Sequence, residues 1–319
     1  MPLLPNSDFK RPKWLFNGHL ETIYPALLRK VNFQAPTKER ISTPDGDFLD
    51  LDWYLGGNSR LTIISHGLEG SSNRPYMLGM AKIFAQNDFD VLAWNYRGCS
   101  GELNDKPIFY HSGATYDLQT IIDHAEKKYA EIFLVGFSLG GNLTLKYLGE
   151  KRHRSPKIKK AVTISVPLDL GKSCDQISTR ENILYSKRFL KSLKEKVVLK
   201  SKKFPDHLDS KGLKHIKSLR DFDNFFTGPL HGFKDAEEYY TMNSSIHFLE
   251  NIQIPTLVLN ALNDPFLSPT CFPKDLAGNL DQVYFEFPNY GGHVGFSSAD
   301  SQKTFYSEAR AVEFIRHDL

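Results

Sequence analysis

Short apolar segments recur along most of this chain, and segments of helical spacing separate them. The apolar segments cover residues 61–65, 90–95, 132–135, 161–166, 255–260 and 282–287. They are hydrophobic throughout rather than at every second position, which is typical of strands buried on both faces of a parallel sheet. Helical spacing is found at 77–86, at 115–129, from 142 onwards and at 301–317. This alternation predicts an α/β fold with a mostly parallel central sheet and helices on both faces.

A different pattern stands before these segments. Asp50 and Asp52 alternate with apolar residues in the segment 48–54, which predicts a half-exposed antiparallel strand. The dipeptide Asp45-Gly46, just before it, is a signal for a hairpin turn. We therefore expect antiparallel strands at the N-terminal edge of the sheet.

Two segments do not follow the alternation. Residues 1–35 are rich in Pro, Trp and His and lack a period, and we expect them to form an ordered arm packed on the main body. Between 169 and 250 the strands stop, and the pattern is helical and basic. From Lys172 to Arg220 there are 14 Lys or Arg against five Asp or Glu. This predicts a helical lid or cap inserted into a single α/β domain that spans residues 1–319.

Composition narrows the class of protein. Of the 319 residues 40% are hydrophobic, and the formal charge of +3 is too small to argue for nucleic-acid binding. Cys99, Cys174 and Cys271 are widely spaced and odd in number, unlike a disulfide framework or a zinc motif. The N-terminus lacks a signal-peptide pattern, and no apolar run reaches the roughly 18 residues that span a membrane. We expect a soluble, cytoplasmic protein; no pattern indicates its oligomeric state.

The most informative motif is Gly136-Phe137-Ser138-Leu139-Gly140, which directly follows one of the apolar segments. A serine hydroxyl attacks an ester only when a base takes its proton and a turn exposes its oxygen. Glycines on both sides of Ser138 permit such a tight strand–turn–helix bend. Because the pentapeptide alone is common by chance, its place between a buried strand and a helix is what indicates a nucleophile.

The serine needs a base, and the base needs an acid that orients it. In an α/β sheet these groups come from loops at the carboxyl ends of strands. Asp264 follows the fifth apolar segment, and His293 lies in a glycine-containing loop after the sixth. The order serine, aspartate, histidine is that of α/β hydrolases. Asp300 is the alternative acid, and Asn263 is the neighbour most easily confused with Asp264.

An ester-cleaving site also needs donors for the oxyanion. His66-Gly67-Leu68-Glu69-Gly70 follows the first apolar segment. In this kind of fold that loop supplies one backbone N–H, and the residue after the nucleophile supplies another. We therefore expect the N–H groups of Leu68 and Leu139 to form the oxyanion hole.

Further motifs resemble those of the YheT-like family in the α/β-hydrolase superfamily. They are Asn17-Gly18-His19-Leu20-Glu21-Thr22-Ile23-Tyr24-Pro25, His66-Gly67-Leu68-Glu69-Gly70-Ser71-Ser72-Asn73, Asn95-Tyr96-Arg97-Gly98-Cys99-Ser100-Gly101, Tyr110-His111-Ser112-Gly113 and Gly292-His293-Val294-Gly295-Phe296. The resemblance spans most of the chain and is weakest from about 180 to 245. It implies an α/β-hydrolase fold that includes the N-terminal arm, with a serine esterase or acyltransferase centre.

The resemblance also implies particular residues and chemistry. It makes Ser138, Asp264 and His293 the catalytic triad. Many relatives carry two aspartates where this chain has Asn263-Asp264; the assigned acid is the second, so the triad is retained. Relatives of this kind include esterases, medium-chain ester synthases, lipases and phospholipases.

Other polar residues of these motifs favour structural roles. His19 could border the pocket, but a structural histidine is the commoner case. His111 and Asp117 lack the spacing of an acyltransferase His-x₄-Asp motif. Tyr96 and Arg97 are expected to anchor a loop rather than to bind substrate.

The basic charge of the lid has three explanations. The lysines and arginines could form a solvated face, attract anionic head groups or a membrane surface, or bind an acidic partner. An apolar stripe of Leu190, Leu193, Val197 and Val198 among the lysines keeps peripheral membrane contact open.

The sequence thus predicts a serine hydrolase that cleaves carboxylic esters of short to medium acyl chains, or lipids, through an acyl-enzyme on Ser138. No metal or organic cofactor is expected, and the partner is a small acyl ester or lipid rather than nucleic acid. Two alternatives stay open: an acyltransferase that uses an alcohol acceptor, and an idle lipid-binding or scaffold protein.

Overall fold

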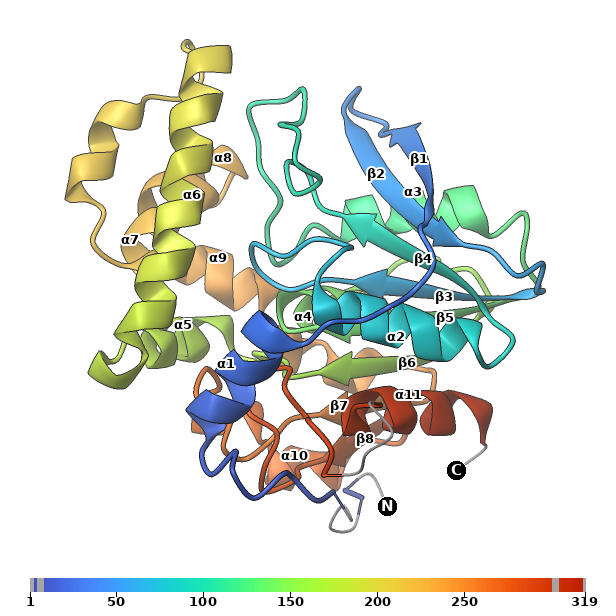
Figure 1. The fold of residues 1–319 in the computed structure, drawn as a ribbon. Helices are drawn as coiled ribbons and strands as arrows, with labels where there is room; N and C mark the ends of the chain where they lie inside the picture. Colours follow the sequence, from blue (N-terminus) through green and yellow to red (C-terminus); the bar gives the residue numbers. More distant parts are fainter. Residues whose placement is uncertain (1–2, 5–8, 300–303, 318–319) are drawn as a thin grey trace.

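The structure, a computed structural model, describes residues 3–4, 9–299 and 304–317 of the chain. At its centre is an eight-stranded sheet in the order β1-β2-β4-β3-β5-β6-β7-β8 (Figure 1). The strands are β1 (Thr37–Ser42), β2 (Phe48–Tyr54), β3 (Arg60–Ser65), β4 (Asp90–Asn95), β5 (Glu131–Phe137), β6 (Ile158–Ile164), β7 (Thr256–Leu259) and β8 (Val283–Glu286). The β1–β2 and β2–β4 pairs are antiparallel and the other pairs parallel, which confirms the predicted sheet.

Helices cover both faces of the sheet, as the alternation predicts. Helices α2 (Pro75–Ala85) and α11 (Tyr306–Arg316) lie on one face, and α3 (Thr115–Ala125) and α4 (Leu139–Gly149) on the other (Figure 1). Successive residues of a strand point to opposite faces, so Leu134 of β5 packs in the α3–α4 core and Val135 in the α2–α11 core. This is why the segment is hydrophobic at every position. Helix α11 begins at Tyr306 rather than at 301, and residues 301–303 lie outside the described residues.

The predicted hairpin is present, but its second strand is more buried than expected. Strands β1 and β2 pair across the turn that contains Asp45 and Gly46. The prediction that β2 is half-exposed is wrong, because Asp50 is the only residue of the strand that is not buried. Asp52 is covered by the loop after β3, whose Ser72 hydroxyl donates to its carboxylate at 2.6 Å. The alternating aspartates therefore do not indicate a strand face exposed to solvent, because the Asp52 carboxylate is buried and hydrogen-bonded.

Between β6 and β7 the structure describes every residue and contains helices but no strand. We call residues 169–250 the lid segment; these bounds, and its role as an insertion into a single domain 1–319, stay predictions. Its α-helices are α5 (Leu170–Ile177), α6 (Ile183–Lys203), α7 (Leu219–Phe222), α8 (Gly228–Leu230) and α9 (Ala236–Asn243). Short 3₁₀ or π helices in the same region are η1 (Arg180–Asn182), η2 (Ser210–His215), η3 (Asp223–Thr227), η4 (Ser245–His247) and η5 (Leu249–Asn251). After β7 follow η6 (Pro269–Cys271) and α10 (Lys274–Ala277).

Helix α6 is the longest helix of the lid segment, and its apolar stripe faces inward. Leu190 and Val197 are buried, and Leu193 packs against them in a core with residues of α7. Only Val198 of the stripe is exposed. The stripe is thus a packing face and not a lipid-contacting surface as the sequence allowed. Among the described residues no helix is both long enough and apolar enough to cross a bilayer.

The N-terminal arm contains a helix that the sequence pattern did not reveal. Helix α1 (Gly18–Leu28) starts at Asn17, whose side chain accepts the Leu20 N–H at 2.9 Å. Its buried residues are Glu21, Thr22 and Pro25, so two of the three are polar. The usual apolar stripe of a packed helix is absent from its buried face, and its partners are instead the loops that carry the candidate site.

Candidate active site

Ser138 lies in the sharp turn between β5 and α4. Its backbone has φ 52° and ψ −118°, a strained conformation for a residue with a side chain. A Cβ added to Gly140 would come within 2.6 Å of the His66 carbonyl oxygen, so only glycine allows the helix to start this close to the neighbouring strand. The predicted glycine requirement of the turn therefore has a direct steric cause.

The three predicted side chains come together above the carboxyl ends of the strands. His293 Nε2 is 2.9 Å from Ser138 Oγ, and His293 Nδ1 is 2.8 Å from Asp264 Oδ2. The Asp264 side chain is fully buried and that of His293 nearly so. A buried carboxylate at Nδ1 favours the tautomer with the proton on that nitrogen, which leaves Nε2 free to accept from the serine.

The neighbours of Asp264 explain why it, and not Asn263, contacts the imidazole. The Phe266 N–H donates to Asp264 Oδ1 at 2.9 Å and fixes the carboxylate. Asn263 turns the other way: its Oδ1 accepts the Gly292 N–H at 3.1 Å. Asn263 thus braces the loop of His293 without touching the ring. Asp300, the alternative acid, lies outside the described residues.

Helix α1 holds the histidine loop from the far end of the chain. Thr22 Oγ1 accepts the backbone N–H of His293 at 2.8 Å. Glu21 Oε2 accepts the Gly291 N–H at 2.8 Å and the Asn263 side-chain N–H at 2.7 Å. Two polar residues of α1 therefore tie together the loops that carry Asp264 and His293. Sequence reasoning did not assign Glu21 or Thr22 a role; the only signal was their place in a family-like motif.

Backbone strain is concentrated around these groups. Among the described residues, six other than glycine have positive φ. Five of them lie in the turns of the site and are Glu69, Ser138, Ser165, Val294 and Phe296. Positive φ is especially unfavourable for a β-branched residue such as Val294. Its N–H donates to Ser165 Oγ at 2.9 Å, and such contacts hold the strained loop in place.

The loop after β3 approaches Ser138 closely. A Cβ added to Gly67 would lie 3.2 Å from Ser138 Cβ. The Leu139 N–H opens helix α4, where first-turn N–H groups have no acceptor within the helix. For the Leu68 N–H no hydrogen-bond acceptor is found in the described part of the chain. Neither predicted oxyanion donor thus has a hydrogen-bond partner in the described part of the chain, and the loop that carries Leu68 approaches Ser138.

His66 orients the peptide that carries one of these donors. Its Nε2 accepts the Tyr96 N–H at 3.2 Å, so Nδ1 carries the proton and donates to the Gly67 oxygen at 2.7 Å. In a trans peptide the Leu68 N–H points opposite to that oxygen. Burial lowers the pKa of His66 to about 3, which keeps the ring neutral and this hydrogen bond constant.

Glu69 connects the same loop to the lid segment. Its backbone N–H donates to the Tyr110 hydroxyl at 2.8 Å, and its carboxylate receives Lys196 Nζ of α6 at 2.7 Å. The Ser192 hydroxyl, also on α6, donates to the other carboxylate oxygen. The Glu69 side chain is 6% exposed and that of Lys196 is 16% exposed, so this ion pair is largely shielded from water. The loop after β3 and helix α6 are therefore coupled directly.

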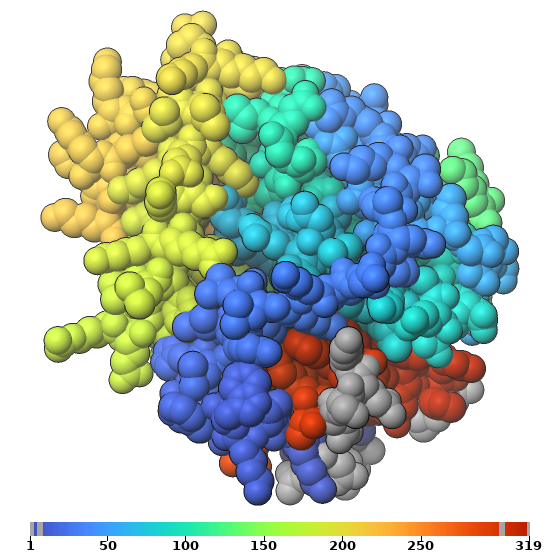
Figure 2. Space-filling view, viewed as in Figure 1, coloured from blue at the N-terminus to red at the C-terminus, as the bar shows by residue number. Residues whose placement is uncertain are grey.

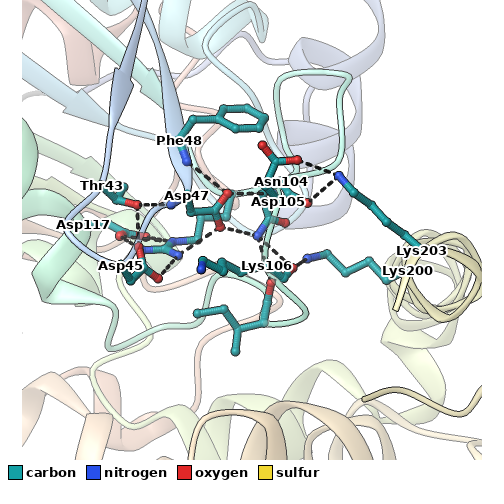
Figure 3. A network of polar contacts seen from close by, with 12 residues as sticks. Thr43, Asp45, Asp47, Phe48, Asn104, Asp105, Lys106, Asp117, Lys200 and Lys203 are labelled. Carbon is teal, nitrogen blue, oxygen red and sulfur yellow. Dashed lines mark hydrogen bonds and ion pairs between the residues drawn. The ribbon is translucent and has the colours of Figure 1, made fainter. Parts of the chain in front are cut away.

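Two more lysines of α6 reach the body of the protein (Figure 3). Lys200 Nζ donates to the carbonyl oxygens of Lys106 and Ile108, the latter at 2.7 Å, and Lys203 Nζ pairs with Asp105 at 2.7 Å. Lys196, Lys200 and Lys203 recur at helical spacing, so they share one face of α6. Some lysines of the lid segment thus bind groups within the protein, which was not among the three explanations drawn from the sequence.

The side chains of Ser138 and His293 open into a cavity of about 540 Å³ under the lid. Its lining is mainly apolar and comes largely from α1, the loop after β3, α5 and α6. It includes Ile23, Leu68, Leu139, Leu170, Ile177, Leu184, Phe189, Leu193 and Phe266. A few polar groups also line it, among them Glu69 and Asp223. Burial raises the pKa of Asp223 to about 6. Volume and lining are those of a site for a small, largely apolar ligand.

The remaining sequence candidates have structural contacts. Arg97 is buried and bonded to Asp117 at 2.7 Å and to two carboxylates of the β1–β2 turn, which confirms its role as a loop anchor (Figure 3). His19 Nδ1 contacts the Tyr185 hydroxyl at 3.2 Å and borders a second cavity behind Asp264. His111 is buried in the wall of the main cavity, and burial lowers its pKa well below the usual value. Cys99, Cys174 and Cys271 are free thiols.

The chain is similar to several known proteins. A model of the α/β-hydrolase fold family matches residues 63–300. YheT, a candidate esterase of Escherichia coli strain K12, is 32% identical over 91% of this chain and 87% of its own length. A monoacylglycerol lipase of Saccharomyces cerevisiae is 30% identical over 92% of this chain and 63% of its own length.

A comparison with solved structures finds the same fold. A solved structure of the esterase Pf2001 of Pyrococcus furiosus superimposes with a TM-score of 0.59, covering 90% of this chain and 97% of the other at 15% identity. The names of YheT and of the monoacylglycerol lipase support the prediction of an enzyme that hydrolyses carboxylic esters. The family match and the YheT relationship together decide the classification: this chain belongs to the α/β-hydrolase family and is one of its YheT-like members.

Proposed function

We propose that the protein is a serine hydrolase that cleaves carboxylic esters with apolar acyl groups through an acyl-enzyme on Ser138. The observation that carries the proposal is the continuous contact from Asp264 through His293 to Ser138, at 2.8 Å and 2.9 Å, within a mainly apolar cavity. These distances are within the range in which a serine and its base exchange a proton.

The first half of the reaction forms the acyl-enzyme. Ser138 Oγ attacks the acyl carbon while its proton passes to His293 Nε2, and Asp264 stabilises the resulting imidazolium. The N–H groups of Leu68 and Leu139 donate to the oxyanion of the tetrahedral intermediate. The intermediate collapses as the bond to the alcohol oxygen breaks, and His293 returns the proton to that oxygen.

The second half releases the acid. A water molecule gives a proton to His293 Nε2 and attacks the acyl carbon, and the same two N–H groups hold the second oxyanion. The bond to Ser138 Oγ breaks, and the serine takes its proton back from the imidazolium. No step needs a group beyond these side chains, the backbone and water.

The lining of the cavity supports esters of apolar acyl groups as the substrate class. Leucine, isoleucine and phenylalanine side chains from α1, α5 and α6 surround the space next to Ser138. A volume of about 540 Å³ is within the usual range for small-ligand sites. The similarity to a monoacylglycerol lipase supports the extension to lipid esters.

Turnover of p-nitrophenyl acyl esters by Ser138→Ala tests the proposal. Loss of the nucleophile should lower kcat by several orders of magnitude, on the order of 10⁴–10⁶. A fluorophosphonate probe should label the unaltered protein and not this variant. Ser59→Ala, a change at an exposed position on the loop before β3, is the matched control and should leave both readouts unchanged.

Undiminished turnover by Ser138→Ala would refute the proposal. Labelling of a different serine would do the same. Product analysis with added ethanol separates the two enzymatic outcomes, because hydrolysis yields the free acid and acyl transfer yields the ethyl ester.

A further inference from the structure

Helix α1 presents apolar side chains to solvent and polar ones to the protein. Its buried residues are Glu21, Thr22 and Pro25, whereas Tyr24, Leu27 and Leu28 are exposed. A surface helix normally has the opposite arrangement. The buried polar residues are explained by the loops that they brace, but the large exposed area of the apolar residues is not explained by packing within the described part of the chain.

The exposed apolar side chains extend beyond α1. We define the mouth surface as Trp14, Phe16, Tyr24, Leu27, Leu28 and Leu184, which are each between 36% and 77% exposed. The rings of Trp14 and Tyr24 contact each other with centroids 4.5 Å apart, so the segment before α1 joins its outer face. Exposed apolar residues gathered in this way mark interaction sites rather than ordinary surface.

The mouth surface borders the cavity of the candidate active site. Leu27 of α1 and Leu184 of α6 belong both to the mouth surface and to the cavity lining. His19 and Tyr185 join the two helices at 3.2 Å. Figure 2 shows the blue N-terminal arm adjoining the yellow-green start of α6 on one face of the molecule. A ligand held at this surface therefore lies at an entrance to the space that contains Ser138.

The charges around the mouth surface are mostly of one sign. Residues 10–30 contain five Lys or Arg and one acidic residue, Glu21, which is buried. Residues 180–191 contain four Lys or Arg against one Glu. Lys13, Lys30 and Lys187 are among the exposed members of this basic rim. An apolar patch with aromatic residues and a cationic rim matches the interface of an anionic bilayer.

We propose that the mouth surface docks on a lipid bilayer that contains anionic lipids, and that ester lipids pass from the bilayer into the cavity. The second part rests on the proposed function; the docking does not. A second copy of the chain is a poorer occupant, because a symmetric contact would bring the two basic rims together. A lipid surface supplies both the apolar phase for the leucines and rings and the negative charge for the rim.

Vesicle co-sedimentation tests the docking. Vesicles of phosphatidylcholine alone and of phosphatidylcholine mixed with phosphatidylglycerol are compared at low and high salt. The unaltered protein should bind the anionic vesicles more strongly, and salt should weaken that binding. The double change Phe16→Asp and Leu28→Asp should reduce partitioning at least about tenfold. Neither residue lines the cavity.

Three controls separate the interpretations. Leu55→Asp, at an exposed leucine just after β2 that is not part of the mouth surface, should bind like the unaltered protein. Lys30→Glu with Lys187→Glu should lower binding to anionic vesicles only. Ser138→Ala should bind vesicles normally, and the Phe16–Leu28 variant should still hydrolyse a water-soluble short-chain ester, which also shows that it is folded.

The outcomes are distinct. Equal vesicle binding by the Phe16–Leu28 variant and the unaltered protein would overturn the docking proposal, as would no binding to anionic vesicles at all. Light scattering could instead show that the unaltered protein is a dimer and that this variant is a monomer. Together with absent vesicle binding, that result would identify a contact between copies and would also overturn the docking proposal. If the unaltered protein binds anionic vesicles as expected but has no esterase activity, the proposed function is refuted and the docking proposal is not.

Discussion

The two halves of helix α6 attach to the rest of the protein by different means. The half towards its C-terminus uses charge: Lys196, Lys200 and Lys203 contact a buried carboxylate, two carbonyl oxygens and an exposed carboxylate. The half towards its N-terminus uses rings, because Tyr185 and Phe189 pack against Phe266 in the loop that follows Asp264. In the sequence both halves belong to one basic, helical segment.

This difference shows that the number of lysines in a segment does not indicate which groups they contact. The charged half fixes the loop after β3 through Glu69, whereas the aromatic half packs on the loop that carries Asp264 and leaves Leu184 exposed at the mouth surface. The lid is therefore anchored at one end and presents apolar surface at the other. Changes along the helix should have effects that depend on which half they fall in.

The largest effect is expected from Lys196→Met. It leaves the buried Glu69 carboxylate without its cation, and losing one member of a buried pair typically costs about 3–5 kcal/mol of stability. The loop that carries the Leu68 N–H loses its anchor to α6, so kcat should fall by about tenfold or more. Thermal unfolding and ester turnover measure the two effects.

Lys191→Met is the matched control, because the side chain of Lys191 on the same helix is 79% exposed. It should change neither readout. Adding Glu69→Gln to Lys196→Met should recover part of the lost stability, since it removes the unpaired charge. Equal effects of Lys191→Met and Lys196→Met would contradict the distinction between inward and outward lysines.

A smaller effect with a specific pH dependence is expected from Lys200→Met. Burial lowers the pKa of Lys200 to about 7 in the folded protein, against about 10.5 when unfolded. Between these values the unfolded chain binds more protons, so the lysine's contribution to the free energy of unfolding rises with pH. The free energy of unfolding of the unaltered protein minus that of the variant should therefore increase from pH 7 to pH 10. Denaturant unfolding across this range measures it, and parallel curves would show that Lys200 does not titrate in this way.

The smallest effect is expected in the aromatic half. Tyr185→Phe keeps the ring contacts and removes only the hydroxyl that meets His19 Nδ1 at 3.2 Å. A single partly exposed hydrogen bond contributes about 1 kcal/mol or less. Chemical denaturation should show this loss, with kcat unchanged. A fall in kcat comparable to that of Lys196→Met would mean that the two halves do not differ as described.

The parts of the fold and site that sequence patterns predicted are the local ones. The strands, the hairpin and the turn at Ser138 are encoded by neighbouring residues, because turn glycines and apolar runs act within a few positions. Asp264 and His293 were found because each follows a strand, and the structure brings both to Ser138. Their catalytic roles, and those of the Leu68 and Leu139 N–H groups, remain proposals to be tested.

What the sequence concealed depends on contacts between distant segments. Thr22 meets the His293 backbone across 271 positions, and nothing near Thr22 indicates that partner. The burial of Asp52 depends on Ser72 in another loop. The positive φ of Val294 is imposed by packing that overrides its own preference. Patterns of polarity predict which elements form, but not which polar groups satisfy one another.

The most direct measurement is mass spectrometry of the protein quenched during turnover of an acyl ester. The account predicts that one acyl group appears on the peptide that contains Ser138, and that His293→Ala forms little or no adduct, because the same imidazole activates Ser138 for the attack. An unmodified Ser138 peptide during active turnover, or an acyl group on another residue, would contradict it.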